Sequence, residues 1–259
     1  MTQAVEPNSS MQASREFCSA IIDLRQYTLY PGTRDVFIEL FDREFVETQE
    51  AAGMRIIGQF RDLGDPNRFV WMRGFPDMPS RKKALTAFYV HGEAWKQHSE
   101  AARSKMIDSS DALLLHPVRP GSAFALEAPV RRSPPESEAP QGLVVAALYH
   151  LPAPMDPEFL GFFDDVVAPA LIAAGGRLLG LFATEHSPNN FPRLPLRESE
   201  NVFIAFLGFG ELEAYHRHMT ALGQNPQWQG EIYPTLLRRL ETPPQILRLA
   251  PTSRSQLRA

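Results

Sequence analysis

A long internal register constrains this chain more than any other feature of its 259 residues. The segment IIDLRQYTL at 21–29 returns as VVAALYHL at 144–151, so that Tyr149 follows Tyr27 by 122 positions. The same separation pairs Phe37 with Phe159, Phe41 with Phe163, Gly53 with Gly175, Arg55 with Arg177 and Gly58 with Gly180. A separation of 134 then pairs Asn67 with Asn201, Phe69 with Phe203 and Gly74 with Gly208. The register predicts a tandem duplication of one module of about 100 residues.

The duplication predicts two modules joined by a linker. We expect a disordered N-terminus at 1–19, a first module at 20–120, a linker at 121–141, a second module at 142–251 and a frayed tail at 252–259. The linker contains VRRSPPESEAPQ, whose Pro, Ser and Glu favour an extended and mobile chain. The second module carries an insertion rich in proline, HSPNNFPRLPLRES, which we interpret either as a lid over a site or as a surface insertion.

Both modules show the element order β-α-β-β-α-α-β. In the first module the patterns predict strands at 21–29, 54–62, 68–74 and 112–118, and helices at 33–53, at 78–88 with Ser80 as its cap, and from Gly92 through Trp95, His98 and Met106. In the second they predict strands at 143–151, 176–184, 201–208 and 245–250, with helices at 157–174 and within 210–240. This order is typical of a ferredoxin-like, split βαβ fold of the α+β class. Such a sheet has helices on one face, and here its other face is apolar too, so we expect the two antiparallel sheets to pack together as an α+β barrel.

Composition argues against several classes of function. The formal net charge of −4 is unfavourable for a nucleic-acid surface, and no apolar run reaches the roughly 18 residues of a membrane span. The N-terminal segment lacks the apolar core of a secretory signal. The single cysteine, Cys18, cannot form an internal disulfide and fits a reducing compartment. We therefore expect a cytoplasmic protein, and pairing of chains into a homo-oligomer stays open.

Several residues of the first module follow one pattern. It comprises an Arg-x-Tyr strand start, an Asn-x-x-x-Trp strand, an arginine on the next helix and a tryptophan near the end of that region, which are here Arg25 and Tyr27, Asn67 and Trp71, Arg81, and Trp95. Over residues 21–118 the chain resembles the NIPSNAP family of dimeric α+β barrel proteins, in a tandem two-copy form. The resemblance implies the fold. Relatives by fold include cofactor-independent monooxygenases of aromatic polyketides and haem-binding enzymes, which place ligands between the sheet and the helices.

The second copy keeps only part of this pattern. Tyr149, Asn201 and Trp228 persist, whereas Ala147 stands in the place of Arg25, Ala205 in that of Trp71 and Tyr215 near that of Arg81. If the polar residues of the pattern bind a ligand, the first copy keeps the better site. That leaves a structural role for the second copy.

Arg25 and Tyr27 are the candidate catalytic residues. They lie two positions apart on one strand and so share a face, with Asp23 on the same face. Arg25 could hold an anionic or enolate oxygen, and Tyr27 could orient or exchange a proton. The candidate ligand-binding residues are Trp71, Arg81, Trp95 and His98. A purely structural role is the alternative, in which Arg25 pairs with Asp23 and the aromatic residues belong to the core.

Three functions follow from these residues. The first is binding of a small aromatic or apolar anionic molecule between the sheet and the helices of the first module, with a cofactor-independent monooxygenase or isomerase as its enzymatic form. The second is a non-enzymatic interaction or scaffold protein that uses the loop at 187–197 and the linker. The third is a haem protein with one axial histidine such as His98, since one such ligand leaves almost no sequence signature. No HExxH or paired CxxC motif predicts a dedicated metal site, and no other cofactor is expected.

Overall fold

The computed structural model describes residues 16–17, 19–126 and 142–259, with the backbone alone at 16 and 17. Cys18, most of the predicted N-terminal segment and the linker from 127 to 141 lie outside the described residues. Within the predicted disordered segment, β1 (Glu16–Phe17) instead pairs with β7 (Ala125–Leu126).

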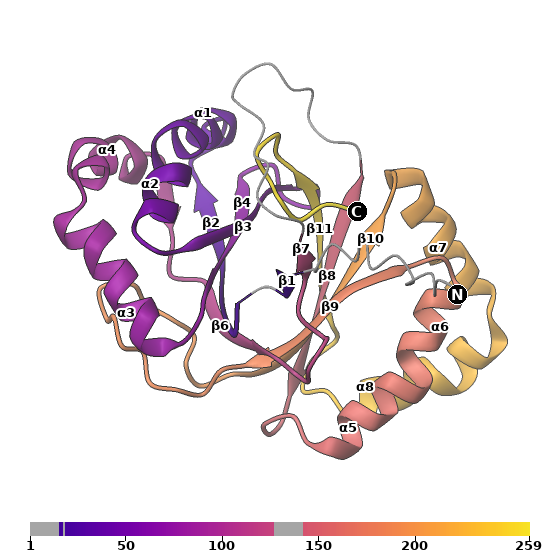
Figure 1. Ribbon diagram of the computed structural model, residues 1–259. Coiled ribbons are helices and arrows are strands. Elements are labelled where there is room, and N and C mark those ends of the chain that lie inside the picture. Colours follow the sequence, from indigo (N-terminus) through magenta and orange to yellow (C-terminus); the bar gives the residue numbers. More distant parts are fainter. Residues whose placement is uncertain (1–15, 18, 127–141) are drawn as a thin grey trace, which may run out of the picture.

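Antiparallel strands form a closed barrel at the centre of the molecule (Figure 1). Around the barrel the order is β4-β3-β11-β8-β10-β9-β6-β2, and β2 pairs with β4 to close it. The strands are β2 (Ile21–Leu29), β3 (Arg55–Asp62), β4 (Arg68–Phe75), β6 (Ala112–Pro117), β8 (Leu143–Leu151), β9 (Arg177–Thr184), β10 (Asn201–Phe209) and β11 (Gln245–Pro251). A short strand, β5 (Met106–Asp108), adds to β2. The two halves join where β11 pairs with β3 and where β6 pairs with β9.

Helices cover the outside of the barrel in two groups, one from each half of the chain (Figure 1). The first group comprises α1 (Arg34–Leu40), π-helical η1 (Phe41–Phe45), α2 (Val46–Ala51), α3 (Met78–Thr86), π-helical η2 (Ala87–His91) and α4 (Glu93–Arg103). The second comprises α5 (Pro157–Phe162), π-helical η3 (Phe163–Val167), α6 (Ala168–Ala173), α7 (Leu212–Gln224), π-helical η4 (Trp228–Ile232) and α8 (Tyr233–Arg238). The predicted α+β barrel is confirmed, and the origin of its halves in a tandem duplication stays a prediction.

Alternation along β2 assigns its side chains to two buried layers. Ile22 and Leu24 belong to the cluster that fills the barrel interior. Asp23, Arg25 and Tyr27 have the opposite parity and face the helices of the first half. Because both faces of the strand are covered, β2 lacks the polar face of an ordinary antiparallel strand, and polar side chains that lie on it are buried.

Residues from the start of the predicted linker and from the predicted tail complete the barrel interior. Phe124, at the start of the predicted linker, packs with its ring centroid 4.6 Å from that of Phe182. It fits because Gly180 has no side chain: a Cβ there would lie 3.1 Å from the Phe124 ring. The predicted frayed tail is also wrong, since Leu257 is buried among the barrel side chains. Its backbone N–H donates to the Ile57 carbonyl oxygen at 2.8 Å.

Three local predictions also need correction. The cap of α3 is Asp77, whose carboxylate accepts the backbone N–H of Ser80 at 2.6 Å, so Ser80 is the capped residue. The helix from Gly92 ends at Arg103, and Met106 lies in β5 beside β2. The run Arg-Lys-Lys at 81–83 predicts a solvated helix start, which is wrong for Arg81, because that side chain is fully buried.

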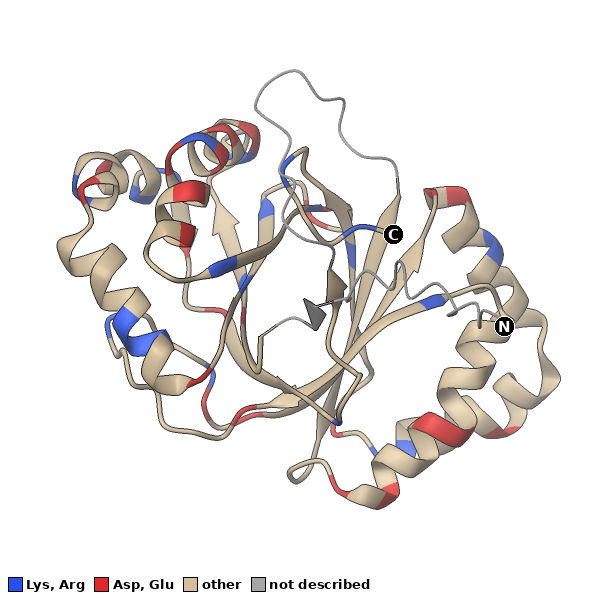
Figure 2. Cartoon of the chain, in the orientation of Figure 1, with Lys and Arg blue, Asp and Glu red and all other residues tan. Residues whose placement is uncertain are grey.

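Charged residues are mixed over the outside of the molecule. Figure 2 shows acidic and basic residues interspersed on the helices, without a continuous basic face in this view. This distribution fits the formal net charge of −4. Within the described parts of the chain, none of the helices combines the length and the apolar character that a bilayer crossing requires.

Candidate functional site

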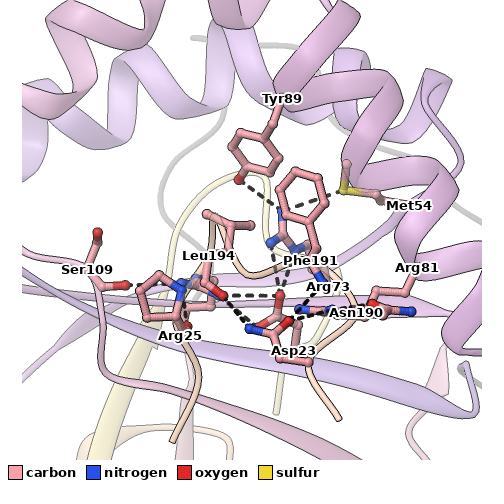
Figure 3. A network of polar contacts seen from close by, with 12 residues as sticks. Asp23, Arg25, Met54, Arg73, Arg81, Tyr89, Ser109, Asn190, Phe191 and Leu194 are labelled. Atoms are coloured by element: carbon pink, nitrogen blue, oxygen red, sulfur yellow. Dashed lines mark hydrogen bonds and ion pairs between the residues drawn. The ribbon is translucent and has the colours of Figure 1, made fainter. Parts of the chain in front are cut away.

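One aspartate and three arginines lie buried between the barrel and the helices of the first half (Figure 3). Asp23 and Arg25 come from β2, Arg73 from β4 and Arg81 from α3. The antiparallel register places Asp23 opposite Arg73 and Arg25 opposite Trp71. We name Asp23, Arg25, Arg73 and Arg81 the arginine cluster.

Asp23 is the shared acceptor of two of these arginines. Its carboxylate accepts from Arg73 Nη2 at 2.9 Å and Nε at 3.1 Å, and from Arg25 Nη1 at 3.2 Å. Arg73 Nη1 donates further to Tyr89 Oη and Gln49 Oε1, both at 3.0 Å. The ion pair between Arg25 and Asp23 is the contact that a structural role for Arg25 predicts. This pair involves Nη1 of Arg25 only, and it does not explain why two further arginines are buried beside it.

The cluster carries more positive than negative charge. Burial alone would raise the pKa of Asp23, but the neighbouring Arg25, Arg73 and Arg81 outweigh it and lower that pKa to about 2. Burial raises the pKa of the Tyr27 phenol, which therefore stays neutral near pH 7. One carboxylate thus faces three guanidinium groups in a region shielded from water, and an excess of buried charge of this kind calls for a counter-ion.

Four N–H-bearing nitrogen atoms of this region are buried without a hydrogen-bond partner among the described residues. They are Arg25 Nε, Trp71 Nε1, Arg81 Nε and Arg81 Nη2. All four are donors, and each unsatisfied buried donor costs about 1–3 kcal/mol. These four nitrogens therefore lack hydrogen-bond acceptors. Three of the residues that the sequence selects, Arg25, Trp71 and Arg81, carry these nitrogens.

The long loop between β9 and β10, residues 185–200, covers the arginine cluster of the other half. Arg81 Nη1 donates to Asn190 Oδ1 at 2.7 Å and to Asn189 Oδ1 at 3.2 Å. Asn190 Nδ2 donates to the Met78 carbonyl oxygen at the start of α3. Phe191 is buried next to Tyr89, with 6.1 Å between ring centroids (Figure 3). The insertion therefore contacts the site that the sequence places in the first module.

The far end of this loop is anchored beside β6. Arg197 pairs with Asp111 at 2.9 Å, and its backbone N–H donates to the Ala112 carbonyl oxygen at 2.8 Å. Between the two anchors, Arg25 Nη2 reaches the Pro195 carbonyl oxygen at 3.5 Å. The loop thus bonds directly to two of the three arginines, Arg25 and Arg81.

The structure divides the residues predicted from the sequence into two groups. Arg25, Tyr27, Trp71 and Arg81 lie in or beside the cluster, and Tyr27 and Trp71 are in edge contact at 5.9 Å. Trp95 contacts Tyr89 at 4.7 Å and lies one layer further out. Sequence reasoning missed Arg73, although it lies two positions after Trp71 and so shares its face.

His98 lies apart from the cluster, and its role as an axial haem ligand stays a prediction. Its Nε2 pairs with the Glu44 carboxylate at 3.3 Å. Its ring lies 6.5 Å from that of Phe45, which packs in turn against Trp95 at 5.6 Å. Nε2 therefore has a carboxylate partner, and the imidazole lies near aromatic rings. In the described parts of the chain, no group of three or more His, Cys, Asp or Glu residues could hold a metal ion.

Comparison with known proteins identifies the first half of the chain. Residues 22–120 match the model of the NIPSNAP family. A candidate monooxygenase from Lactobacillus acidophilus NCFM shares the fold with a TM-score of 0.53 and 12% identity, over 89% of this chain and 93% of that one. An anthrone oxidase-like protein shares it with a TM-score of 0.52 and 14% identity, over 92% of this chain and 95% of that one. At these identities the similarity shows a shared fold only. No curated protein matches the chain.

Proposed function

Because residues 22–120 form a NIPSNAP domain, we propose that this domain binds a small aromatic or apolar anion at the arginine cluster. The observation that carries the proposal is the set of four buried donor nitrogens without partners beside an excess of positive charge. A carboxylate or phenolate supplies both of the missing elements, namely acceptor oxygens and negative charge. Hydrogen bonds of this charge-assisted kind are about twice as strong as neutral ones.

The surroundings of the cluster favour an anion with an apolar body. Trp71 is buried against Phe41 at 4.9 Å and against Tyr27 at 5.9 Å. Arg73 lies over the Trp71 ring at 4.8 Å. A flat ring beside these aromatic residues would keep its charged end among the guanidinium groups, as in most small-molecule sites, where a few polar groups orient an apolar ligand.

The loop at 185–200 is the entrance in this proposal. Asn189 and Asn190 occupy Arg81 Nη1 from the loop side, and Pro195 reaches Arg25. A ligand would enter as the loop lifts and would replace these weaker neutral acceptors. These contacts also argue against the scaffold hypothesis, because polar groups of the loop form hydrogen bonds within the chain instead of facing a partner.

Binding is better supported than proton transfer. The lowered pKa of Asp23 makes it a weak base, and the neutral Tyr27 phenol can donate but not abstract a proton. An isomerase would need a stronger base than either. A cofactor-independent monooxygenase is the second candidate, since cations that hold a carboxylate also stabilise an enolate or phenolate.

Oxygen uptake with anthrone, the compound in the name of one relative by fold, tests the second candidate. Uptake that falls at least about tenfold in Arg25→Met would support catalysis at the cluster, because it would remove about 1.4 kcal/mol or more of stabilisation from the transition state. Uptake that the variant leaves unchanged would place any reaction elsewhere.

Replacement of Arg81 by methionine is expected to weaken the binding of 1-naphthoate by about 10- to 100-fold, since hydrogen bonds to charged groups contribute about 1.5–3 kcal/mol. Isothermal titration calorimetry measures the affinity. Lys82→Met is the matched control, because Lys82 is the next residue on the same helix and is exposed. Equal affinity in Arg81→Met and the wild type, with circular dichroism confirming the fold of both, would contradict the proposal.

A further inference from the structure

The second half of the chain contains a cavity of about 310 Å³ between the barrel and its helices. The floor is formed by β8 and β10 through Val145, Ala147 and Leu207, and the helices contribute Leu171, Trp228 and Leu236. The volume lies at the lower end of the about 300–1,000 Å³ typical of small-molecule pockets. The cavity is therefore large enough for a compact ligand.

The cavity lies at the position that corresponds to the arginine cluster of the first half. The register of β8 with β10 repeats that of β2 with β4, at separations of 122 and 134 positions. The residues at the corresponding positions are Asp23 and Val145, Arg25 and Ala147, Trp71 and Ala205, and Arg73 and Leu207. Long charged and aromatic side chains are thus replaced by small or aliphatic ones, and the cavity is the space that this replacement leaves.

The lining carries no charged side chain. It contains no lysine, arginine, aspartate or glutamate from the described residues, and the ring of Trp228 stacks on that of Tyr233 with 5.8 Å between centroids. Burial lowers the pKa of His218, so its imidazole is neutral near pH 7. An ionic ligand would lose its hydration here without gaining a counter-charge. A neutral apolar ligand does not pay this desolvation cost, so the lining favours it.

Two buried polar groups face the cavity. Tyr149 is only 4% exposed, and it lines the cavity. Nδ1 of His218 lies 3.2 Å from the Ala174 carbonyl oxygen. That oxygen can only accept, so Nδ1 carries the proton and Nε2 is left as an acceptor. A tyrosine hydroxyl group that lines an apolar space can donate a hydrogen bond to one oxygen of a ligand.

We propose that the second half of the chain binds a neutral, flat, apolar molecule, such as a small aromatic compound, that carries one oxygen able to hydrogen-bond with Tyr149. This site differs from the arginine cluster in charge and in shape. The chain then holds two sites on opposite sides of one barrel, one for an anion and one for a neutral ligand. The loss of the polar pattern from the second copy is in this view a change of ligand.

Titration with 1-naphthol, followed by tryptophan fluorescence and by calorimetry, tests this proposal. We expect saturable binding that Ala147→Phe weakens by more than about tenfold, because the new ring fills the cavity. Tyr149→Phe should weaken binding by about two- to tenfold through the loss of one hydrogen bond. Ala173→Phe, an exposed position on α6, makes the same alanine-to-phenylalanine change outside the cavity and should leave binding unchanged.

Matched ligands separate the two sites. Binding of 1-naphthol should persist in Arg81→Met, and binding of 1-naphthoate should persist in Tyr149→Phe, so either site can fail alone. If Ala147→Phe does not fold, Tyr149→Phe, which keeps the ring, decides the test. The proposal is overturned if the wild type does not bind 1-naphthol saturably. It is also overturned if neither variant alters binding.

Discussion

Asp23→Asn is expected to lower the free energy of unfolding by about 3–5 kcal/mol, the usual cost of breaking a buried ion pair by removing one partner. Asp23 is fully buried and is the only carboxylate that the described contacts bring to Arg25 and Arg73. The substitution keeps the shape of the side chain and removes its charge, which leaves the guanidinium groups buried without compensation. Urea denaturation followed by circular dichroism measures the change.

Glu211→Gln provides the matched control for this experiment. Glu211 pairs with Arg217 at 3.1 Å, but both side chains are more than 60% exposed. Exposed pairs of this kind contribute about 0–1 kcal/mol. A loss in Asp23→Asn as small as that in the control would show that the arginines do not depend on Asp23, and would remove the basis for the charge argument at the cluster.

The same carboxylate predicts how stability depends on acid. Its pKa in the folded state, about 2, lies below the ordinary value of 3.8. Its contribution to stability is therefore fully present above about pH 4, and it is lost as the pH falls through the interval from 4 to 2. Asp23→Asn should lose this part of the acid dependence. Unfolding curves between pH 2 and 6, compared for wild type and variant, measure it.

Removal of residues 252–259 is the second change for which we expect a large loss of stability. Leu257 lies in the barrel interior, and its replacement by alanine alone should cost about 2–5 kcal/mol. The truncation also leaves two strand carbonyl oxygens without partners, because the backbone N–H groups of Leu257 and Thr252 donate to Ile57 and Gln59. We therefore expect the truncated chain to unfold at much lower urea concentration, or to fail to fold.

Leu212→Ala serves as the control for Leu257→Ala. It makes the same change at a leucine that is 41% exposed at the start of α7, and it should cost far less. Thermal denaturation of the three variants and the wild type gives the comparison. A truncated protein with an unchanged midpoint would mean that the tail is not part of the barrel, as a frayed tail would be.

Local patterns in the sequence determined much of the fold. The separations of 122 and 134 aligned β2 with β8 and β4 with β10, and the register of these strands follows those pairs. Strand parity placed Asp23, Arg25 and Tyr27 on one face, because successive side chains of a strand alternate whatever the strand packs against. The strand order and the apolar character of both faces then required helices on one side and a second sheet on the other.

Contacts between distant segments decided the sites. Nothing local in HSPNNFPRLPLRES indicates that Asn190 reaches Arg81, more than 100 positions earlier, because that contact depends on the closure of the barrel between β6 and β9. The burial of Leu257 depends likewise on an open space beside β3. Alanine at 147 indicated a lost residue, but whether its space was filled by neighbours or left as a cavity depends on how helices pack above it. The sequence by itself determined which side chains share a face, and only the tertiary structure decided which of those faces are filled, covered or empty.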